Sequence, residues 1–254
     1  MTIKGMAQKP PVIYAFSFSL FLLAWWYASS RTIPAFLPSP VVTFRALLEL
    51  IDAKILFGAI GISFLRIVSG WLIGGLVGIP VGLLMGRVRF IKHFATPYIE
   101  FFRFIPPIAF VSLFLIWFGS GETSKIMLII YTTVFIVVLN TMAGAMTVNE
   151  GVIRAARCLG ATESQLLFRV IIPSTVPYMI TGMRIAMGSS FMTIVAAEMI
   201  AANSGIGYII WSSRNYMLTD QIFVAIVALG LMGFISDRAV NWIAKRLLRK
   251  YQDS

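Results

Sequence analysis

The chain has 254 residues, of which 59% are hydrophobic and only 12% are charged, and its mean hydropathy is +0.88. Soluble globular proteins contain about 45–50% apolar and about 25% charged residues, so this composition excludes both an ordinary soluble domain and a disordered chain. The net charge of +11 would suggest nucleic acid as a partner of a soluble protein. In a membrane protein the same excess marks cytoplasmic loops, so we predict a multi-pass membrane protein with no nucleic-acid partner.

Apolar stretches long enough to cross a bilayer occur six times, since one helical crossing takes about 20 residues. The first is read as a retained helix, because no small-residue cleavage site follows it at a suitable distance. An even number of crossings places both termini on one side of the membrane. The predicted spans are residues 12–28, 57–85, 101–118, 126–146, 173–201 and 222–244.

The 21 Lys and Arg residues predict which side that is, because positive charge gathers on the cytoplasmic side. Twelve lie in the terminal segments and in the second and fourth connections: Lys4, Lys9, Arg87, Arg89, Lys92, Arg154, Arg157, Arg169, Lys245, Arg246, Arg249 and Lys250. Five lie in the other connections: Arg31, Arg45, Lys54, Lys125 and Arg214. The N- and C-termini are therefore predicted to be cytoplasmic.

Two connections are long enough to carry structure of their own. Residues 29–56 contain three prolines and then an amphipathic stretch, 41–51, which predicts a helix at the membrane interface. Residues 149–169 form the only sizeable inner connection, and their richness in Ala, Leu, Arg and Glu favours a helical loop. No clear internal repeat or low-complexity segment occurs, so residues 1–254 are predicted to form one transmembrane domain.

The second span carries five glycines at intervals of four residues, which form one slowly winding ridge without side chains along a helix. Such ridges let helix backbones approach closely in lipid. Pro80 lies on the same helix and is expected to bend it. We predict that the ridge packs within the bundle, with a mobile contact to another subunit as the alternative. The glycines are Gly70, Gly74, Gly78, Gly82 and Gly86.

The third span begins with Arg103 and the pair Pro106-Pro107. Two adjacent prolines leave backbone carbonyls without partners, which is tolerated at membrane depth only where protein or a water-filled cavity covers them. These residues predict either a helix that lines a pathway or a simple kinked helix.

Ionisable side chains inside spans are costly and usually face the bundle interior, a partner or a cavity. Arg66 and Arg184 lie deep in their spans and have no carboxylate at helical spacing. They therefore either pair across helices, with Glu198 as one option, or offer positive potential to an anion that crosses the membrane. Asp237 and Arg238, near the inner end of the last span, are interpreted as structural.

The inner loop combines small residues with flanking charges and leads into the fifth span through Pro173, whose missing N–H is harmless at a helix start. A short helix is expected to break near Gly160. This surface suits docking into a groove on a cytoplasmic partner, and an ordinary interfacial helix is the alternative. The candidate docking residues are Glu150, Arg154, Ala155, Ala156, Gly160, Ala161 and Pro173.

The run from Arg154-Ala155-Ala156 through Gly160 to Val170, Ile172 and Pro173 resembles the EAA loop of ABC importer permeases of the binding-protein-dependent type. The resemblance implies that this loop is the coupling helix, which sits in a groove of the ATPase subunit. Arg154 departs from the pattern, because the family usually has a glutamate there, and the salt bridge attributed to that glutamate is not expected.

Motifs along most of the chain are similar to the nitrate, sulfonate and taurine subfamily of these permeases, and taurine permeases are the most similar at Arg154 and residues 121–125. The motifs are Leu37-Pro38-Ser39-Pro40, Ser63-Phe64-Leu65-Arg66, Arg103-Phe104-Ile105-Pro106-Pro107, Trp117-Phe118-Gly119, Gly121-Glu122-Thr123-Ser124-Lys125 and Ala196-Ala197-Glu198-Met199-Ile200. The resemblance implies an all-α, six-helix permease of the type I importer fold in a bacterial inner membrane. It also implies a homodimer with two cytoplasmic ATPase subunits and a periplasmic substrate-binding protein.

The sequence contains no Gly-x-x-x-x-Gly-Lys-Ser/Thr phosphate loop, so the energy for transport must come from a partner or an ion gradient. The resemblance implies a non-catalytic subunit whose partner ATPase binds ATP and Mg. The single cysteine, Cys158, excludes a cysteine-based metal cage, and no cofactor or metal of its own is expected. We predict transport of a small anion, in the first place taurine or another alkanesulfonate, with nitrate, bicarbonate or an aromatic acid as alternatives. The candidate pathway residues are Arg66, Arg103, Pro106, Pro107, Arg184 and Glu198.

Three rival classes are disfavoured by the same residues. An ion-coupled secondary transporter would show inverted repeats and would leave the structured inner loop unexplained. An intramembrane serine enzyme would need a base within hydrogen-bond reach, whereas His93 and Ser63 lie toward opposite sides of the membrane. A channel would need no loop that docks onto an ATPase.

Overall fold

Helices make up most of the residues that the computed structural model describes, which are 10–252, and no β-strand occurs among them. Lys4 and Lys9, which entered the prediction of the topology, lie outside these residues, and nothing is described of the side chains of Arg249 and Lys250. The elements are α2 (Pro10–Ser30), α3 (Pro40–Asp52), α4 (Ile55–Arg87), α5 (Arg89–Arg103), η1 (Pro107–Phe110), α6 (Val111–Phe118), α7 (Glu122–Met146), α8 (Glu150–Cys158), α9 (Glu163–Leu166), η2 (Leu167–Ile171), α10 (Ile172–Ala201), α11 (Ile206–Asn215) and α12 (Thr219–Gln252).

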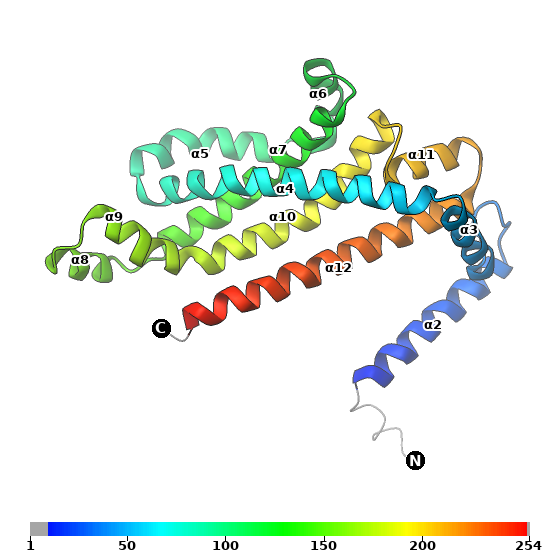
Figure 1. Ribbon diagram of the computed structural model, residues 1–254, viewed down its shortest axis with the longest axis horizontal. Coiled ribbons are helices and arrows are strands. Elements are labelled where there is room, and N and C mark those ends of the chain that lie inside the picture. The colour runs from blue at the N-terminus through cyan, green and yellow to red at the C-terminus, as the bar shows by residue number, and fades with distance from the viewer. Residues whose placement is uncertain (1–9, 253–254) are drawn as a thin grey trace, which may run out of the picture.

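The long helices α4, α7, α10 and α12 run along the long axis of the molecule (Figure 1). Helices α8 and α9 lie at one end of this axis, and α3, α6 and α11 lie toward the other. We call these the α8 end and the opposite end. Within the described residues, five helices are long and apolar enough to cross a membrane, or six if one bent pair counts as a single crossing. The predicted all-helical membrane class is confirmed.

The third crossing differs from the prediction of a helix over residues 101–118. The bent pair of helices that would form this crossing begins at Arg89 and consists of α5 followed by the η1–α6 segment, and the two parts are bent by 88° relative to each other. The break falls at Pro106, whose backbone is extended with φ −60° and ψ 137°. A residue before proline is driven out of the helical region, so Pro107 ends the helical path at that point. The expected distortion at the two prolines is therefore a full break.

Helices α4 and α7 pack with their backbones close together. A Cβ atom built on each glycine of the ridge would lie only 2.5–2.9 Å from a side-chain carbon of α7. The glycines oppose a row of α7 residues that is also spaced by four: Ile129, Thr133, Val137, Thr141 and Ala145. Without side chains on one helix, the two backbones reach a separation that any larger residue would prevent.

The largest apolar core joins α3, α4, α10, α11 and α12 at the opposite end, and α7 contributes Ile129 to it. The amphipathic helix expected over 41–51 is present as α3, whose buried face is formed by Thr43, Ala46 and Leu50. Ser39 caps the start of α3 by accepting a hydrogen bond from the amide of Val42.

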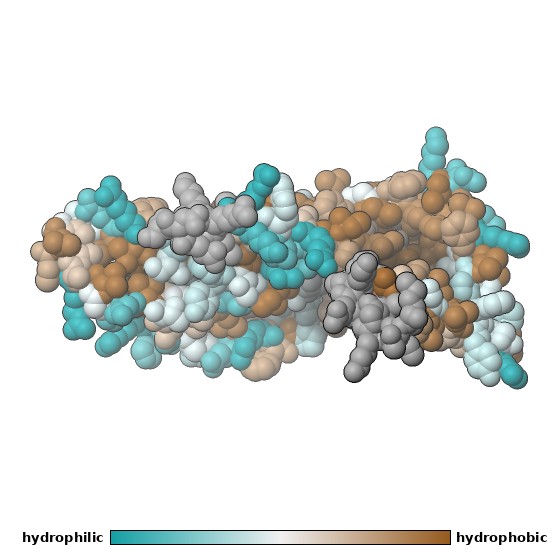
Figure 2. Space-filling view, turned by 90° about the horizontal axis from the view of Figure 1, so that it is seen from below, coloured by the Kyte–Doolittle hydropathy of each residue, from teal (hydrophilic) through white to brown (hydrophobic). Residues whose placement is uncertain are grey.

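Helix α2 stands apart from the bundle and has most of its surface exposed (Figure 1). It is attached through Trp25, whose indole N–H donates to the carbonyl of Pro38 at 3.0 Å and whose ring stacks on Phe223. Seen from below, hydrophobic residues cover much of the right half of the molecule, while hydrophilic residues gather toward the ends and in a patch near the middle (Figure 2). This distribution fits a molecule surrounded by lipid over part of its length.

Candidate functional site

A buried cluster of charges joins four helices toward the opposite end of the bundle. Arg66 of α4 is 3% exposed, and its guanidinium donates to two carboxylates. Nε and Nη2 bind Glu122 at the start of α7, at 2.5 and 2.6 Å, while Nη1 binds Glu198 of α10 at 2.7 Å. The same guanidinium donates to the carbonyl and hydroxyl oxygens of Ser204. The sequence left two roles open for Arg66, which were pairing across helices and attraction of an anion. In the structure Arg66 pairs with carboxylates on two other helices.

Glu198 is fully buried and accepts hydrogen bonds from three residues on two other helices, α4 and α11. Ser63 Oγ on α4 donates to its carboxylate at 2.8 Å, Arg66 donates at 2.7 Å, and the amide of Gly207 donates at 2.9 Å. Gly205 turns the backbone toward this carboxylate just before α11, and its φ of +108° is a conformation that residues with a side chain rarely adopt. The cluster therefore fastens the turn before α11 onto the bundle.

A second ion pair lies between α10 and α12, far from the ends of both helices. Arg184 Nε and Nη2 donate to the two carboxylate oxygens of Asp237 at 2.6 and 2.9 Å. The side chains of Arg184 and Asp237 are 46% and 43% exposed, whereas those of Arg66 and Glu198 are buried. The Arg184–Asp237 pair lines a cleft of about 530 Å³ that also contains Thr181, Asn241 and Lys245.

The broken third crossing borders a smaller cavity of about 250 Å³. Arg103 and Pro107 line it together with Tyr131 of α7. The hydroxyl of Tyr131 donates to the carbonyl of Phe102 at 2.5 Å, just before the break. Pro106 is exposed next to this cavity, and the guanidinium of Arg103 stacks over the ring of Phe104 at 4.5 Å. Thus the sequence motif at the two prolines lies beside a cavity, although no charged partner binds Arg103 among the described residues.

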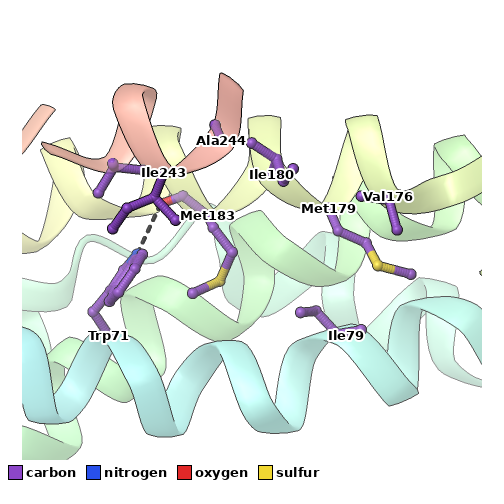
Figure 3. A pocket seen from close by; sticks show the side chains of 9 residues that line it. Trp71, Ile79, Val176, Met179, Ile180, Met183, Ile243 and Ala244 are labelled. Carbon is purple, nitrogen blue, oxygen red and sulfur yellow. Dashed lines mark hydrogen bonds between the residues drawn. The ribbon is translucent and has the colours of Figure 1, made fainter. Parts of the chain in front are cut away.

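An apolar cavity of about 350 Å³ lies between α4, α10 and α12, next to the Arg184–Asp237 cleft, with which it shares Ile180 and Ala244 (Figure 3). Methionine and isoleucine side chains surround it, and Trp71 closes one side with its indole N–H donating to the carbonyl of Met183 at 2.8 Å. Its lining offers no charged group, so polar chemistry in this region is confined to the Arg184–Asp237 cleft.

The loop 149–169 folds as two short helices around an apolar core of its own, formed by Val148, Ile153 and Leu166. Asn149 caps α8, and a capping box formed by Thr162 and Gln165 begins α9. Between them Gly160 adopts φ +83°, which is the break that the sequence predicts.

The candidate docking residues divide between the two faces of α8. Arg154, Ala155 and Gly160 are exposed, whereas Ala156 and Ala161 pack against the core of the loop. Val152 and Leu159, 52% and 90% exposed, share the outer face with Ala155 and were not singled out from the sequence. Glu150 pairs with Arg87 at 3.5 Å, and Pro173 lies in the first turn of α10 after a π-helical turn. An exposed apolar face bordered by arginines is therefore available at the α8 end.

The sequence did not identify Glu122 as the partner of Arg66, or Asp237 as the partner of Arg184. Glu122 entered only as part of a motif, and Asp237 was interpreted apart from Arg184. Each lies more than 50 positions from its arginine, so no helical spacing could have indicated the pairing. The described residues contain no group of three or more His, Cys, Asp or Glu side chains that could hold a metal ion.

Comparison with known proteins gives concordant results. A family profile described as "Binding-protein-dependent transport system inner membrane component" matches residues 78–249. The taurine transport system permease protein of Escherichia coli is 36% identical over 238 residues, covering 90% of this chain and 86% of that protein. The nitrate import permease protein of Synechococcus elongatus is 32% identical over 256 residues, covering 96% and 92%. The solved MetNI methionine ABC transporter, in an inward facing conformation, matches with a TM-score of 0.61 at 18% identity, covering 78% of this chain and 95% of that one.

Proposed function

Because the chain belongs to the family of binding-protein-dependent transport system inner membrane components, in which it is an ABC importer permease, we propose that it forms the pathway for a small anion. Taurine or another alkanesulfonate is the substrate proposed first. The observation that carries this choice is the open arginine of the Arg184–Asp237 cleft, together with the 36% identity to a taurine permease. An exposed guanidinium provides several N–H donors for a sulfonate.

Nitrate is the second candidate, because a nitrate import permease is 32% identical over nearly the whole chain. A planar anion could occupy the same cleft, but it would leave Asp237 without a partner if Arg184 turned toward it. Bicarbonate and small aromatic acids are chemically allowed as well. Taurine or another alkanesulfonate remains the first choice, because the identity to the taurine permease is higher, at 36%.

We place the pathway along the exposed face of α10 and the broken third crossing. Arg184, Arg103, Pro106 and Pro107 line it in this proposal, since each lies in or beside an open cavity. Arg66 lines a separate cavity of about 270 Å³, and Glu198 is fully buried. Both are saturated by each other and by their neighbours, so we assign them to holding the helices together. The glycine ridge holds α4 against α7 behind this face.

The assembly that we propose contains two copies of this chain, two cytoplasmic ATPase subunits that bind ATP and Mg, and a periplasmic substrate-binding protein. The exposed outer face of α8 is the surface that fits an ATPase groove. The protein would lie in a bacterial inner membrane, with both termini and the α8 end on the cytoplasmic side. Binding and hydrolysis of ATP in the partner would then drive alternating access.

Uptake measurements on the reconstituted complex test this function. The chain is co-expressed with its ATPase and placed in proteoliposomes, with the binding protein on the outer side and ATP inside. We expect accumulation of radiolabelled taurine that requires both ATP and the binding protein. Equal accumulation without ATP would contradict the proposal, and uptake of nitrate in place of taurine would favour the second candidate.

Substituting Ala155 on the outer face of α8 by glutamate is expected to abolish docking of the ATPase. Ala155 is exposed, so the change puts a charge into the proposed interface without disturbing the core of the loop. We expect co-purified ATPase and uptake to fall at least tenfold, because burying an unpaired charge in an interface costs several kcal/mol.

The matched control is Asn203→Glu, which places the same charge on an exposed turn at the opposite end. This variant should retain its ATPase. If Ala155→Glu co-purifies with as much ATPase as the control does, the outer face of α8 is not the docking surface.

A further inference from the structure

The Arg184–Asp237 pair differs from ordinary helix-to-helix ion pairs in being open to a cleft. Both side chains are nearly half exposed although their positions lie well inside membrane-crossing helices. Arg184 is 12 positions after Ile172, or about 18 Å along the helix axis. A charged pair exposed to lipid at such a depth is unfavourable, so this cleft must face water or another polar surface.

Arg184 and Asp237 have hydrogen-bonding groups that their mutual contact does not use and that a ligand could bind. Arg184 uses two of its five N–H donors on Asp237, and the carboxylate of Asp237 has further lone pairs. Lys245 and Asn241 lie in the same cleft, while Gly188 leaves open space because a Cβ atom there would touch nothing within 4 Å. A volume of about 530 Å³ is within the range of small-molecule sites.

Charge balance decides which ligand suits the cleft. A simple anion that drew Arg184 away would leave the carboxylate of Asp237 unpaired inside the membrane. A ligand with both an acidic and an ammonium group could replace the two halves of the pair at once, and no charge would lose its partner. The second cation, Lys245, is available to an acidic group with several oxygens.

We propose that this cleft is a transient binding site for a small zwitterion, with its acidic group at Arg184 and its ammonium group at Asp237. The inference rests on the proposed function and narrows its substrate class from alkanesulfonates in general to aminosulfonates such as taurine. Arg184 and Asp237 then act as one specificity-determining pair. When the ligand leaves, the two side chains close on each other again.

Equilibrium binding to the full-length chain, purified in detergent with its ATPase and without the binding protein, tests the site. The probes are radiolabelled taurine, isethionate, which has a hydroxyl in place of the amine, and β-alanine, which has a carboxylate in place of the sulfonate. We expect taurine to bind at least tenfold more tightly than isethionate. In Asp237→Asn this ratio should fall at least tenfold, while Arg184→Gln should weaken binding of both sulfonates.

The control is Arg238→Gln, which removes the neighbouring charge on α12. Arg238 stacks over Phe234 and does not line the cleft, so the ratio should stay at the wild-type value. Melting temperatures of all variants identify any change that is only structural. An unchanged ratio in Asp237→Asn, or no binding of taurine by the wild type, would overturn the inference.

Uptake by the full complex separates this inference from the proposed function. If ATP-driven uptake of taurine occurs but the purified chain does not bind it, the zwitterion site fails and the proposed function stands. If the complex takes up no sulfonate, the proposed substrate fails and the inference falls with it. Binding of β-alanine at least as tight as that of taurine would support the zwitterion site while contradicting the choice of sulfonate.

Discussion

Replacing Arg66 by methionine is expected to destabilise the protein by about 3–5 kcal/mol, because Glu198 is left buried without its charged partner. Glu198 is fully buried and would keep only the donors from Ser63 and Gly207. In a chain of this size the loss corresponds to a fall in melting temperature of roughly 6–20 °C. The measurement is the apparent melting temperature of the purified chain in detergent at one fixed heating rate, since unfolding is expected to be irreversible.

Two further variants show whether the unpaired carboxylate is the cause. The double variant Arg66→Met with Glu198→Met removes both charges and should be more stable than Arg66→Met alone. Glu122→Gln should cost less than about 1 kcal/mol, because the side chain of Glu122 is 58% exposed and its charge is screened by solvent. If the double variant is no more stable than Arg66→Met, the cost comes from packing and the assignment of Arg66 as the partner of Glu198 is wrong.

Two Gly-to-Ala substitutions in the same helix are expected to change stability in opposite directions. At Gly82 an added Cβ would lie 2.7 Å from both the backbone oxygen of Val138 and the Cβ atom of Thr141, so α4 and α7 would have to separate. Overpacking of this kind costs about 1–3 kcal/mol, or roughly 2–12 °C in melting temperature. At Gly61 nothing lies within 4 Å of an added Cβ, and alanine should stabilise the helix by about 0.5–1 kcal/mol.

The comparison of the two alanine variants uses the same measurement of melting temperature. Combining Gly82→Ala with Gly74→Ala should cost less than the sum of the two single effects, because both changes act through the same separation of α4 from α7. A stabilising effect at Gly82, or equal effects at Gly82 and Gly61, would mean that close approach of the two helices does not depend on the ridge.

Much of the fold follows from the sequence, because a membrane crossing is a local property. Each span must satisfy its own backbone hydrogen bonds, so length and hydropathy suffice to locate α4, α7, α10 and α12. The glycine ridge and the break at Gly160 are local in the same sense, since both depend on residue type and spacing along one helix or turn. The prediction of a single helix over residues 101–118 is less accurate. Two adjacent prolines indicate a break in a helix but do not determine its angle, and the observed bend is 88°.

The candidate site depends on properties that no single segment contains. The sequence identified Arg66, Arg184 and Glu198 as costly charges, but it left open whether they pair or face an anion. Their charged partners lie on other helices, 53 to 132 positions away, and the rotation of each helix in the bundle decides which side chains meet. The same rotation left Arg66 and Glu198 buried against each other and the Arg184–Asp237 pair open to a cleft.

The amino-acid sequence by itself determined that the chain contains helices long and apolar enough to cross a membrane, and which face of α4 is free of side chains, because both properties depend on neighbours within about one or two helical turns. Only the tertiary structure decided which charges neutralise each other and which remain accessible, because lateral packing brings together residues that the chain keeps far apart.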